Sequence, residues 1–436
     1  MENTNYNYDE LTIALDIGTT KVVAIAGHRN DYGKVEIVGM GTVASEGVSR
    51  GVVANIDKTV KAIREAITIA EKNAQRKFKY VHVGVAGQHI KSLHHHGIHV
   101  RDDATSEISE KDVEILINKM YKLVLPPGDK ILHVFPQEFI VDNESDIMDP
   151  VGMSGVRLEA NFHVITGQIS ASRNLMRCVE KVGLEVVDMT LEPIASSAAV
   201  LSAEEKEAGV VLVDIGGGTT DITIFKDGII RHTAVIPFGG NIITRDIRDG
   251  CTVMNQQAEK LKVKFGSALA EAIYDNKIIM IPGLRGRDPK EISEKNLAKI
   301  IQARLEEIFD YVLWEIRRSG YEGKLIAGLV LTGGGSLLKN INLLAERHTG
   351  ISSRIGQPID HLAHGYGQEL ASPIYSTAIG LLINTIENAE RAGETRVGSD
   401  ENNEHEVSGD SLPQKWFNRI YTYTKDFFDE TPDSEL

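Results

Sequence analysis

The chain has 436 residues, with 62 acidic against 47 basic side chains and a formal net charge of −15. This excess of acid argues against general binding to nucleic acid, whose affinity depends on neutralising phosphates. The polar, acidic N-terminus is unlike a signal peptide, and no run approaches the roughly eighteen apolar residues of a membrane span. Cys178 and Cys251 offer no disulfide framework and no metal-like spacing, so we expect two core residues in a cytoplasmic protein.

The first informative element is ALDIGTTKVVAIAG, residues 14–27, which predicts two apolar strands joined by a Gly/Thr turn. Glycine at the tip of a hairpin exposes backbone N–H groups to phosphate oxygens, because no Cβ blocks their approach. Asp16 lies where the first strand enters the turn, and Thr19 and Thr20 add hydroxyl donors. A single copy of this pattern is more often an ordinary hairpin between core strands.

The stretch from about Gly84 to His163 is too long for one connection and predicts an inserted domain. It contains strand-like segments at both ends and a helical segment, EKDVEILINKMYKLV, after Ser109. Five histidines gather there and raise the alternative of a zinc site: His89, His94, His95, His96 and His99. They have no Cys or carboxylate partner at ligand spacing, so a solvated strand edge is favoured.

A second hairpin, LVDIGGGTTDITIF at 212–225, repeats the first, with Asp214 in the place of Asp16. If the two hairpins face one another, the two carboxylates can share a hydrated Mg²⁺. A third glycine cluster, Gly333 to Gly335, follows a buried strand, and we expect Ser336 to cap the helix after it. Such a turn lets a flat adenosine lie against the backbone. Together the three motifs predict a nucleotide clamp.

The C-terminal region divides into two segments. Residues 393–412 are dominated by Glu, Asp, Asn, Ser and Gly, which predicts a flexible linker. PQKWFNRIYTYTKDFF, residues 413–428, follows, and at about 100° per residue its aromatic side chains share a face of roughly 160° between basic edges. This pattern fits an anionic membrane surface, and docking into a protein groove is the alternative. The expected membrane contacts are Lys415, Trp416, Phe417, Arg419, Ile420, Tyr423, Phe427 and Phe428. The acidic residues 429–436 should point back into solvent.

The two hairpins and the TGGG turn, in this order, resemble the superfamily of actin, the Hsp70 chaperones and the sugar kinases. The resemblance implies an α/β, two-lobed ATPase fold of duplicated RNase H-like halves that binds ATP and Mg²⁺. LEPIASSAAVL, 191–201, is similar to the helix that connects the halves, whose leading acid orients the attacking water. Glu192 is therefore the candidate water-positioning residue, with helix capping as the alternative.

AEKLKVKFG, from Ala258, resembles the helix that grips the nucleoside, which implies Glu259 near the ribose and Lys262 beside the adenine. A surface ion pair between these two residues is the alternative. Lys21 is implied to reach the phosphates, and Asp16 and Asp214 to hold Mg²⁺ through water. The resemblance thus implies a nucleotide site of Asp16, Gly18, Thr19, Thr20, Lys21, Asp214, Gly216, Gly217, Gly218, Thr219, Thr220, Glu259, Lys262, Gly333, Gly334 and Gly335.

The position of the insert and its phrases HVFPQEF and PVGMSGVRLEANFHVITG resemble the FtsA family of bacterial cell-division proteins. This resemblance spans roughly residues 11–385. It implies a peripheral protein at the division septum that polymerises on the cytoplasmic face of the membrane. Its partners would be membrane lipids, further copies of itself, the C-terminal peptide of the tubulin-like FtsZ, and later division proteins. ATP would act as a switch, with at most slow hydrolysis.

The implied domains follow the same resemblance. They are a first half (11–83, 164–192 and 359–385), an inserted subdomain for polymer contact (84–163), a second half (193–224 and 305–358), an outer subdomain that binds the filament protein (225–304), a linker (386–412), a membrane helix (413–428) and an acidic tail (429–436). The alternatives are a pilus-assembly scaffold of the same fold and a small-molecule kinase. The kinase would need a second substrate pocket with an acidic base, for which the sequence has no motif.

Overall fold

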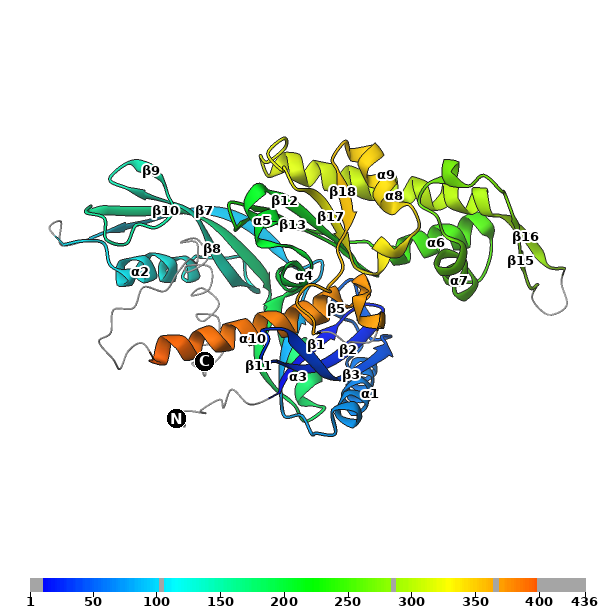
Figure 1. Ribbon diagram of the computed structural model, residues 1–436, viewed down its shortest axis with the longest axis horizontal. Coiled ribbons are helices and arrows are strands. Elements are labelled where there is room, and N and C mark those ends of the chain that lie inside the picture. Colours follow the sequence, from blue (N-terminus) through cyan, green and yellow to red (C-terminus); the bar gives the residue numbers. More distant parts are fainter. Residues whose placement is uncertain (1–10, 102–105, 284–287, 364–367, 398–436) are drawn as a thin grey trace.

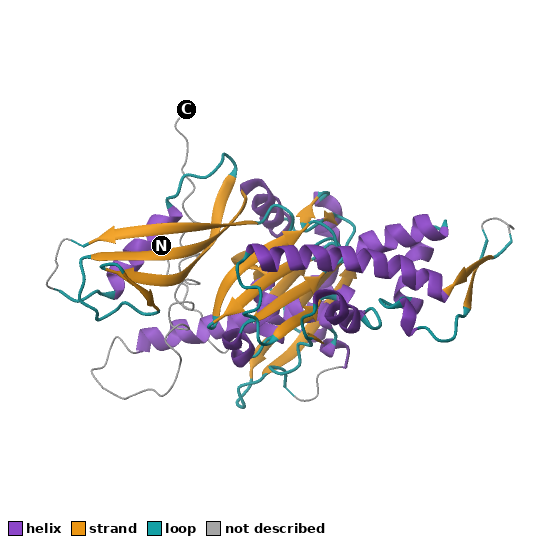
Figure 2. Cartoon of the chain, turned by 90° about the horizontal axis from the view of Figure 1, so that it is seen from above, coloured by secondary structure: helices purple, strands orange, loops and turns teal. Residues whose placement is uncertain are grey.

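The computed structural model describes residues 11–101, 106–283, 288–363 and 368–397. They form two central sheets, one above the other, with an inserted domain projecting from one end and a helical extension from the other (Figure 1). Seen from above, the insert and the extension lie on opposite sides of these sheets (Figure 2). The predicted linker beyond 397 and the predicted membrane helix lie outside the described residues.

The first sheet has the order β11-β6-β1-β2-β3, with β1 and β6 parallel and β1, β2 and β3 an antiparallel meander. Its strands are β1 (Thr12–Ile17), β2 (Lys21–Arg29), β3 (Val35–Ala44), β6 (Tyr80–Val85) and β11 (Glu185–Leu191). Helix α1 (Ile56–Ala74) packs on β2, β3 and α3 (Ile169–Glu180), whereas α10 (Ser376–Val397) packs on β1, β2, β6 and α4 (Glu192–Val200). A short ribbon, β4 (Val48–Ser49) with β5 (Val52–Val53), follows β3.

The second sheet, β14-β13-β12-β17-β18, repeats the strand order of the first. Its strands are β12 (Val210–Ile215), β13 (Thr220–Lys226), β14 (Ile229–Ile236), β17 (Gly328–Thr332) and β18 (Ser353–Ile355). Helices α5 (Ala203–Ala208), α8 (Glu294–Arg318) and α9 (Ile341–Thr349) pack around it. The repetition is the duplication that the two related sequence motifs predict.

The insert is an antiparallel sheet, β7-β10-β8-β9, packed on one helix and built around its own hydrophobic core. Its elements are β7 (Lys91–Val100), α2 (Glu110–Tyr121), β8 (Asp129–Val141), β9 (Glu144–Ile147) and β10 (Arg157–Gln168). Strand β10 stays paired with β8 to Gln168, so the predicted end at 163 cuts through a strand. The insert meets the second half where β7, β8 and β10 contact β14.

The predicted outer subdomain begins too early. Strand β14 pairs with β13 along its length and belongs to the second sheet, so the extension starts near Gly240 rather than at 225. The sequence feature that indicates the β13–β14 hairpin is Asp227–Gly228. These two residues have positive φ angles of 56° and 72° and form the tight turn that Asp-Gly favours between two strands. The extension comprises α6 (Gly240–Cys251), α7 (Asn255–Phe265), β15 (Ile278–Ile281), β16 (Lys290–Ser293) and the start of α8, and it shares its hydrophobic core with the second half.

The predicted linker also needs correction, because α10 continues to Val397 and makes residues 386–397 helical. Arg29, on β2, forms ion pairs with Glu387 at 3.8 Å and Glu390 at 3.0 Å. Contact with the first half therefore extends the helix into a segment whose local composition predicts a flexible chain.

Candidate functional site

The turns of the two glycine hairpins face one another at the junction of the two halves. A Cβ on Gly217 would overlap the side chain of Thr20, and one on Gly218 would overlap Thr19. The hydroxyl of Thr19 also accepts a hydrogen bond from the backbone N–H of Gly51 at 3.1 Å. The glycines of the second turn are therefore needed for the close approach of the two hairpins, and Thr19 and Thr20 lie at their contact.

In the first hairpin the carboxylate has a cationic partner. Asp16 is buried, and its Oδ2 lies 3.5 Å from Nζ of Lys21, which begins β2 on the other side of the turn. The strand pairing of β1 with β2 brings the two together, since Asp16 is opposite Val23 and Ile17 opposite Val22. Gly18 lies within this turn, where a Cβ would come within 3.1 Å of the Lys21 carbonyl oxygen.

In the second hairpin the carboxylate is held by neutral hydroxyls. Ser196 donates to Oδ2 of Asp214 at 2.7 Å and Thr377 donates to the same atom at 3.4 Å. Burial raises the pKa of Asp214 above its usual value, and these two hydrogen bonds and Lys21 oppose the increase. Ser196 comes from α4 and Thr377 from α10, so two helices that pack against each other hold the carboxylate of the second hairpin.

Glu192 is the first residue of α4 and adjoins the end of β6, where a Cβ on Gly84 would lie 3.4 Å from its Oε1. Burial of the carboxyl raises the pKa of Glu192 well above its usual range, and the neighbouring Asp16, Asp221 and Asp214 add to the increase. No side chain caps α4 at Leu191, which disfavours the capping alternative. Glu192 thus lies in the cleft beside both hairpin carboxylates.

Asp221 is a fourth carboxylate of this group that the sequence prediction omitted, although it ends the DIGGGTTD motif. It lies directly opposite Asp214 in the β12–β13 pair and is buried. Burial raises its pKa to about 7, with a further contribution from Asp214. Thr219 donates to its Oδ2 at 3.0 Å. Four carboxyl groups are therefore neighbours here, those of Asp16, Glu192, Asp214 and Asp221. Lys21 is the cation that opposes the rise in the pKa values of Glu192 and Asp214.

The third glycine turn lies against the second hairpin. A Cβ on Gly333, whose φ is 78°, would overlap the carboxylate of Asp214, and one on Gly335 would overlap Ile215, whereas the corresponding position on Gly334 is open. The helix that follows differs from the prediction. Ser336 donates to the Gly333 carbonyl oxygen within a short 3₁₀ helix, Gly334–Leu337, and α9 begins only at Ile341 after Asn340.

Glu259 and Lys262 on α7 form an ion pair at 2.9 Å, which was the alternative to their predicted contacts with the nucleoside, and the pair also reaches the second hairpin. Lys262 donates to the Gly240 carbonyl oxygen at 2.9 Å and to the Thr244 hydroxyl at 2.8 Å, and that hydroxyl donates to Glu259. Gly240 in turn donates to the carbonyl oxygen of Gly216 at 2.8 Å. The pair is thus connected to the Gly216–Thr220 turn and is more than an isolated surface contact.

These residues fit a nucleotide with a hydrated divalent cation. All three glycine turns meet at one place, and four carboxylates exceed the charge that Lys21 can balance. Within the described parts of the chain, no three His, Cys, Asp or Glu side chains are arranged to hold a metal ion directly. Magnesium held through water by Asp16 and Asp214 therefore stays a prediction.

The histidines of the insert are distributed between two environments. His96 on β7 contacts Glu159 at 2.7 Å and Asn161 at 2.9 Å, and these hydrogen bonds raise its pKa. His89 is buried and His94 is exposed at the surface, and desolvation lowers the pKa values of both. The zinc alternative gains no support from these positions. Cys178 and Cys251 are free thiols buried in the hydrophobic cores, as predicted.

Comparison with protein families and curated proteins gives concordant matches. Residues 87–166 match the model of the SHS2 domain inserted in FtsA, and residues 211–380 match the model of the cell division protein FtsA. The chain is 43% identical over 375 residues to the cell division protein FtsA of Pseudomonas aeruginosa, covering 86% of this chain and 89% of the relative. It is 35% identical to FtsA of Escherichia coli, covering 86% and 90%.

Solved structures show the same fold at low sequence identity. A type IV pilus biogenesis complex of PilM and PilN matches with a TM-score of 0.63 at 15% identity, covering 86% of this chain and 98% of that chain. MreB5 of Spiroplasma citri bound to ADP matches with a TM-score of 0.53 at 16% identity, covering 91% and 100%. The predicted two-lobed, actin-like fold with an inserted domain is therefore confirmed. At this identity the pilus protein supports a shared fold and not the pilus-scaffold alternative.

Proposed function

Because this chain belongs to the FtsA family of cell-division proteins, we propose that it is an ATP-responsive membrane anchor for the division filament. The observation that carries the nucleotide part is the convergence of three glycine turns on four carboxylates and Lys21. In this proposal the protein polymerises under the membrane, binds the C-terminal peptide of FtsZ there and recruits later division proteins.

The residues at the junction of the three glycine turns suit a nucleotide-dependent switch better than a fast ATPase. Bound ATP with Mg²⁺ would supply a terminal phosphate that both hairpins can hold and that hydrolysis removes. In this proposal Lys21, Thr19 and Thr20 bind phosphate oxygens, whereas the hydroxyls of Thr219 and Thr220 already donate to Asp221 and to the Phe238 carbonyl oxygen. In this proposal Glu192 orients the attacking water, and its burial beside three other carboxylates raises its pKa well above the usual range. A carboxyl with a raised pKa ionises less readily, so we expect slow hydrolysis.

The membrane attachment rests on the sequence of residues 413–428, which lie outside the described part of the chain. Among the described residues, no helix has the length and apolar character required to cross a membrane. Fifteen residues, 398–412, separate the end of α10 from the predicted membrane helix, and a random coil of that length would span roughly 20–25 Å. A polymer would therefore present many tails to one bilayer, and avidity would strengthen weak individual binding.

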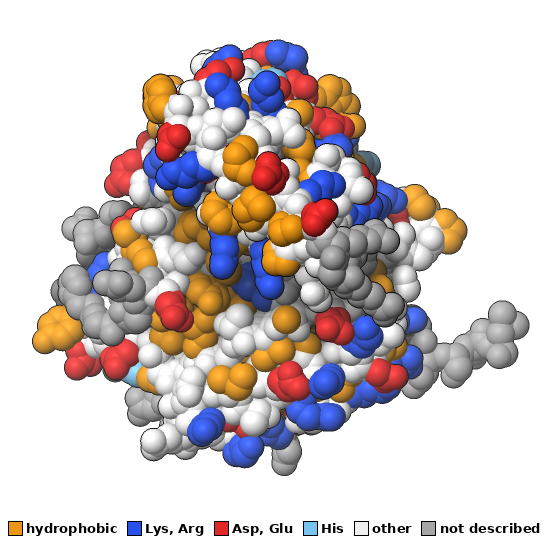
Figure 3. Space-filling view, turned by 90° about the vertical axis from the view of Figure 1, so that its right-hand side faces the viewer, with side chains coloured by type: hydrophobic (Ala, Val, Ile, Leu, Met, Phe, Trp, Pro, Cys, Tyr) orange, Lys and Arg blue, Asp and Glu red, His pale blue; other side chains and the backbone are white. Residues whose placement is uncertain are grey.

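The helical extension is the proposed site for the filament protein. Several large apolar side chains in it are exposed: Met254, Val263, Phe265, Tyr274, Ile278 and Met280. Figure 3 looks at this end of the molecule and shows hydrophobic side chains gathered between interspersed acidic and basic ones. Exposed apolar surface rimmed by charge is typical of a protein-binding site.

The membrane part is tested with Trp416→Glu in the full chain and Trp416→Phe as the matched control. A charge in the apolar face should abolish sedimentation with anionic liposomes and disperse a fluorescent fusion through the cytoplasm, whereas the aromatic replacement should retain both. Calorimetry with ATP should give the same affinity for all three proteins, because residue 416 is remote in sequence from every nucleotide motif. Sedimentation of Trp416→Glu at the wild-type level would contradict the membrane role and favour a protein groove.

A further inference from the structure

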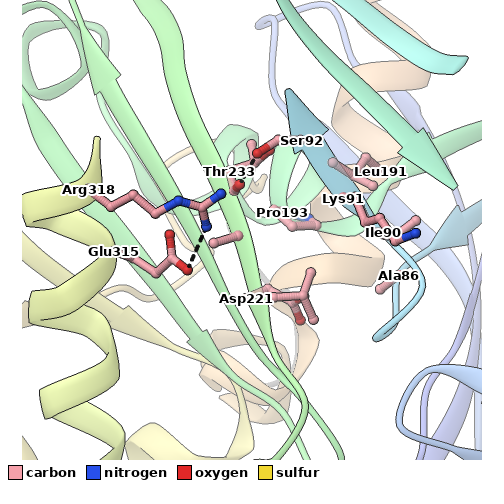
Figure 4. Close-up of a pocket in the computed structure, with 12 residues that line it drawn as sticks. Ala86, Ile90, Lys91, Ser92, Leu191, Pro193, Asp221, Thr233, Glu315 and Arg318 are labelled. Atoms are coloured by element: carbon pink, nitrogen blue, oxygen red, sulfur yellow. Dashed lines mark hydrogen bonds and ion pairs between the residues drawn. The ribbon is translucent and has the colours of Figure 1, made fainter. Parts of the chain in front are cut away.

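A cavity of about 290 Å³ lies where the insert meets the second half, and Asp221 is one of its lining residues. Figure 4 shows Glu315 and Arg318 of α8 on one side, Ile90 and Lys91 at the start of the insert on the other, and Asp221 between them. Its volume is at the lower end of the range for small-molecule pockets, about 300–1,000 Å³. None of the glycines of the three turns lines it.

Asp221 gives this cavity a buried acceptor that no protein group uses. Its Oδ2 accepts from Thr219, but its Oδ1 is buried and has no hydrogen-bond partner. The residue is only 6% exposed, and a buried carboxylate oxygen without a donor is costly. The neighbouring carboxylate of Asp214 makes the surroundings more negative still. A ligand that brings a donor or a positive charge would relieve both costs.

The cations at the cavity wall are already engaged. Arg318 lies 3.4 Å from Glu315 and stacks over the ring of Trp314, with 5.3 Å between the guanidinium carbon and the ring centroid. Lys91 forms an ion pair with Asp129 at 3.2 Å, and its side chain is 61% exposed. Glu315 accepts from His232 at 2.8 Å and is satisfied as well. Among the described residues that line the cavity, Asp221 therefore keeps the unpartnered acceptor, which favours a ligand that brings a donor.

The remaining walls are apolar and come from four elements. Ala86 and Ile90 lead into the insert, Leu191 and Pro193 border α4, and Ala234 and Val235 belong to β14. Ser92 donates to the Thr233 carbonyl oxygen at 2.8 Å and so joins β7 to β14 across the cavity. A flat hydrophobic group would fill this space while its polar end reaches Asp221.

We propose that this cavity is a binding site for a small organic cation, an amine or amidinium carried on a flat apolar body. The cation would donate to Oδ1 of Asp221, and the body would lie between the insert and β14. Occupancy would hold the insert against the second half. Binding of the cation to this cavity does not depend on the function proposed above. Any effect of that binding on polymerisation would rest on that function.

The test uses benzamidine as the probe on the full-length protein, with benzoate as a probe of the same shape and opposite charge. Titration calorimetry and ligand-observed NMR should give saturable benzamidine binding with a Kd of about 0.1–1 mM and at least tenfold weaker benzoate binding. Asp221→Asn should weaken benzamidine binding at least tenfold. Asp310→Asn, an equal charge change on an exposed part of α8 away from the cavity, should not alter it.

Ala234→Leu provides a second variant, because it fills the cavity without touching a carboxylate, and it should abolish benzamidine binding in a protein with an unchanged circular dichroism spectrum. The proposal is overturned if benzoate binds as tightly as benzamidine, if neither variant weakens binding, or if wild type shows no saturable binding. Displacement of benzamidine by ATP and Mg²⁺ would place it at the glycine turns and overturn the proposal too. A protein that binds benzamidine but no ATP would instead contradict the proposed function alone.

Discussion

The two glycine hairpins have nearly the same sequence and strand pairing, but their carboxylates have opposite surroundings. Asp16 pairs with Lys21 at 3.5 Å within its own hairpin. The equivalent Asp214 accepts only from hydroxyls, those of Ser196 and Thr377, and has a second carboxylate, Asp221, across the strand pair. The sequence of the second turn explains the difference, because Thr219 stands where the first hairpin has Lys21, and Asp221 stands where it has Val23.

This difference assigns unequal roles to the two halves. In the first hairpin Lys21 balances the charge of Asp16, and we propose that the same lysine binds phosphate. The second hairpin carries buried negative charge that burial alone makes unfavourable, as the raised pKa values of Asp214 and Asp221 indicate. A divalent cation would therefore stabilise the second hairpin more than the first.

The largest expected effect tests this asymmetry directly. Asp214→Ala should weaken binding of Mg-ATP by about 100-fold, equivalent to about 2.8 kcal/mol, but metal-free ATP by less than about threefold, because the lost charge acts mainly through the ion. Asp16→Ala should cost less, since it frees Lys21 to pair with phosphate. Calorimetry of both variants with and without Mg²⁺ decides the matter. Equal losses of Asp214→Ala in the two conditions would make Asp214 a structural residue.

The next effect concerns Glu192, whose pKa is raised by the carboxylates of both hairpins. Glu192→Gln keeps the shape of the side chain but cannot orient water as a carboxylate, so ATP hydrolysis should slow by at least about tenfold. ATP affinity should stay within about threefold of wild type. Glu322→Gln, at an exposed glutamate that pairs with Arg317 and lies outside every nucleotide motif, serves as the control and should leave the hydrolysis rate within about twofold. Single-turnover assays measure both, and an unchanged rate in Glu192→Gln would remove this residue from the mechanism.

The sequence alone predicted the features that depend on local pattern. Each hairpin is a strand, a carboxylate and a glycine turn in continuous sequence, so its place in the fold follows from a short segment. Ser196 and Thr377 escaped prediction as partners of Asp214 because they lie 18 and 163 residues from it along the chain. The helical structure of residues 386–397 escaped prediction for the same reason, since Glu390 in this part of α10 pairs with Arg29, far away in sequence.

The smallest expected effect is a difference in the pH dependence of stability between wild type and Asp221→Asn. The folded pKa of Asp221 is about 7 and the ordinary value is 3.8, so between these pH values the folded protein holds a proton that the unfolded chain has lost. The free energy of unfolding therefore falls as pH rises through this window. Asparagine does not ionise, so the variant should gain on wild type as pH increases from 5 to 8.

Other groups titrate in the same range but do not obscure the comparison. Burial lowers the pKa of His133 to about 4 and of His163 to about 3, so their contribution is present above pH 6.5 and is lost as pH falls. This contribution has the opposite sign and is common to both proteins, so the difference between them reports on Asp221 together with its neighbouring carboxyls, Glu192 and Asp214. Melting temperatures at pH 5 and pH 8 should show a relative gain of Asp221→Asn on the order of 2–4 °C. Saturating Mg²⁺ and ATP should reduce that gain, because the cation would stabilise the ionised carboxylates of the second hairpin. Parallel pH profiles without Mg²⁺ would show that Asp221 is already balanced, and the electrostatic contrast between the two hairpins would then rest on Asp214 alone.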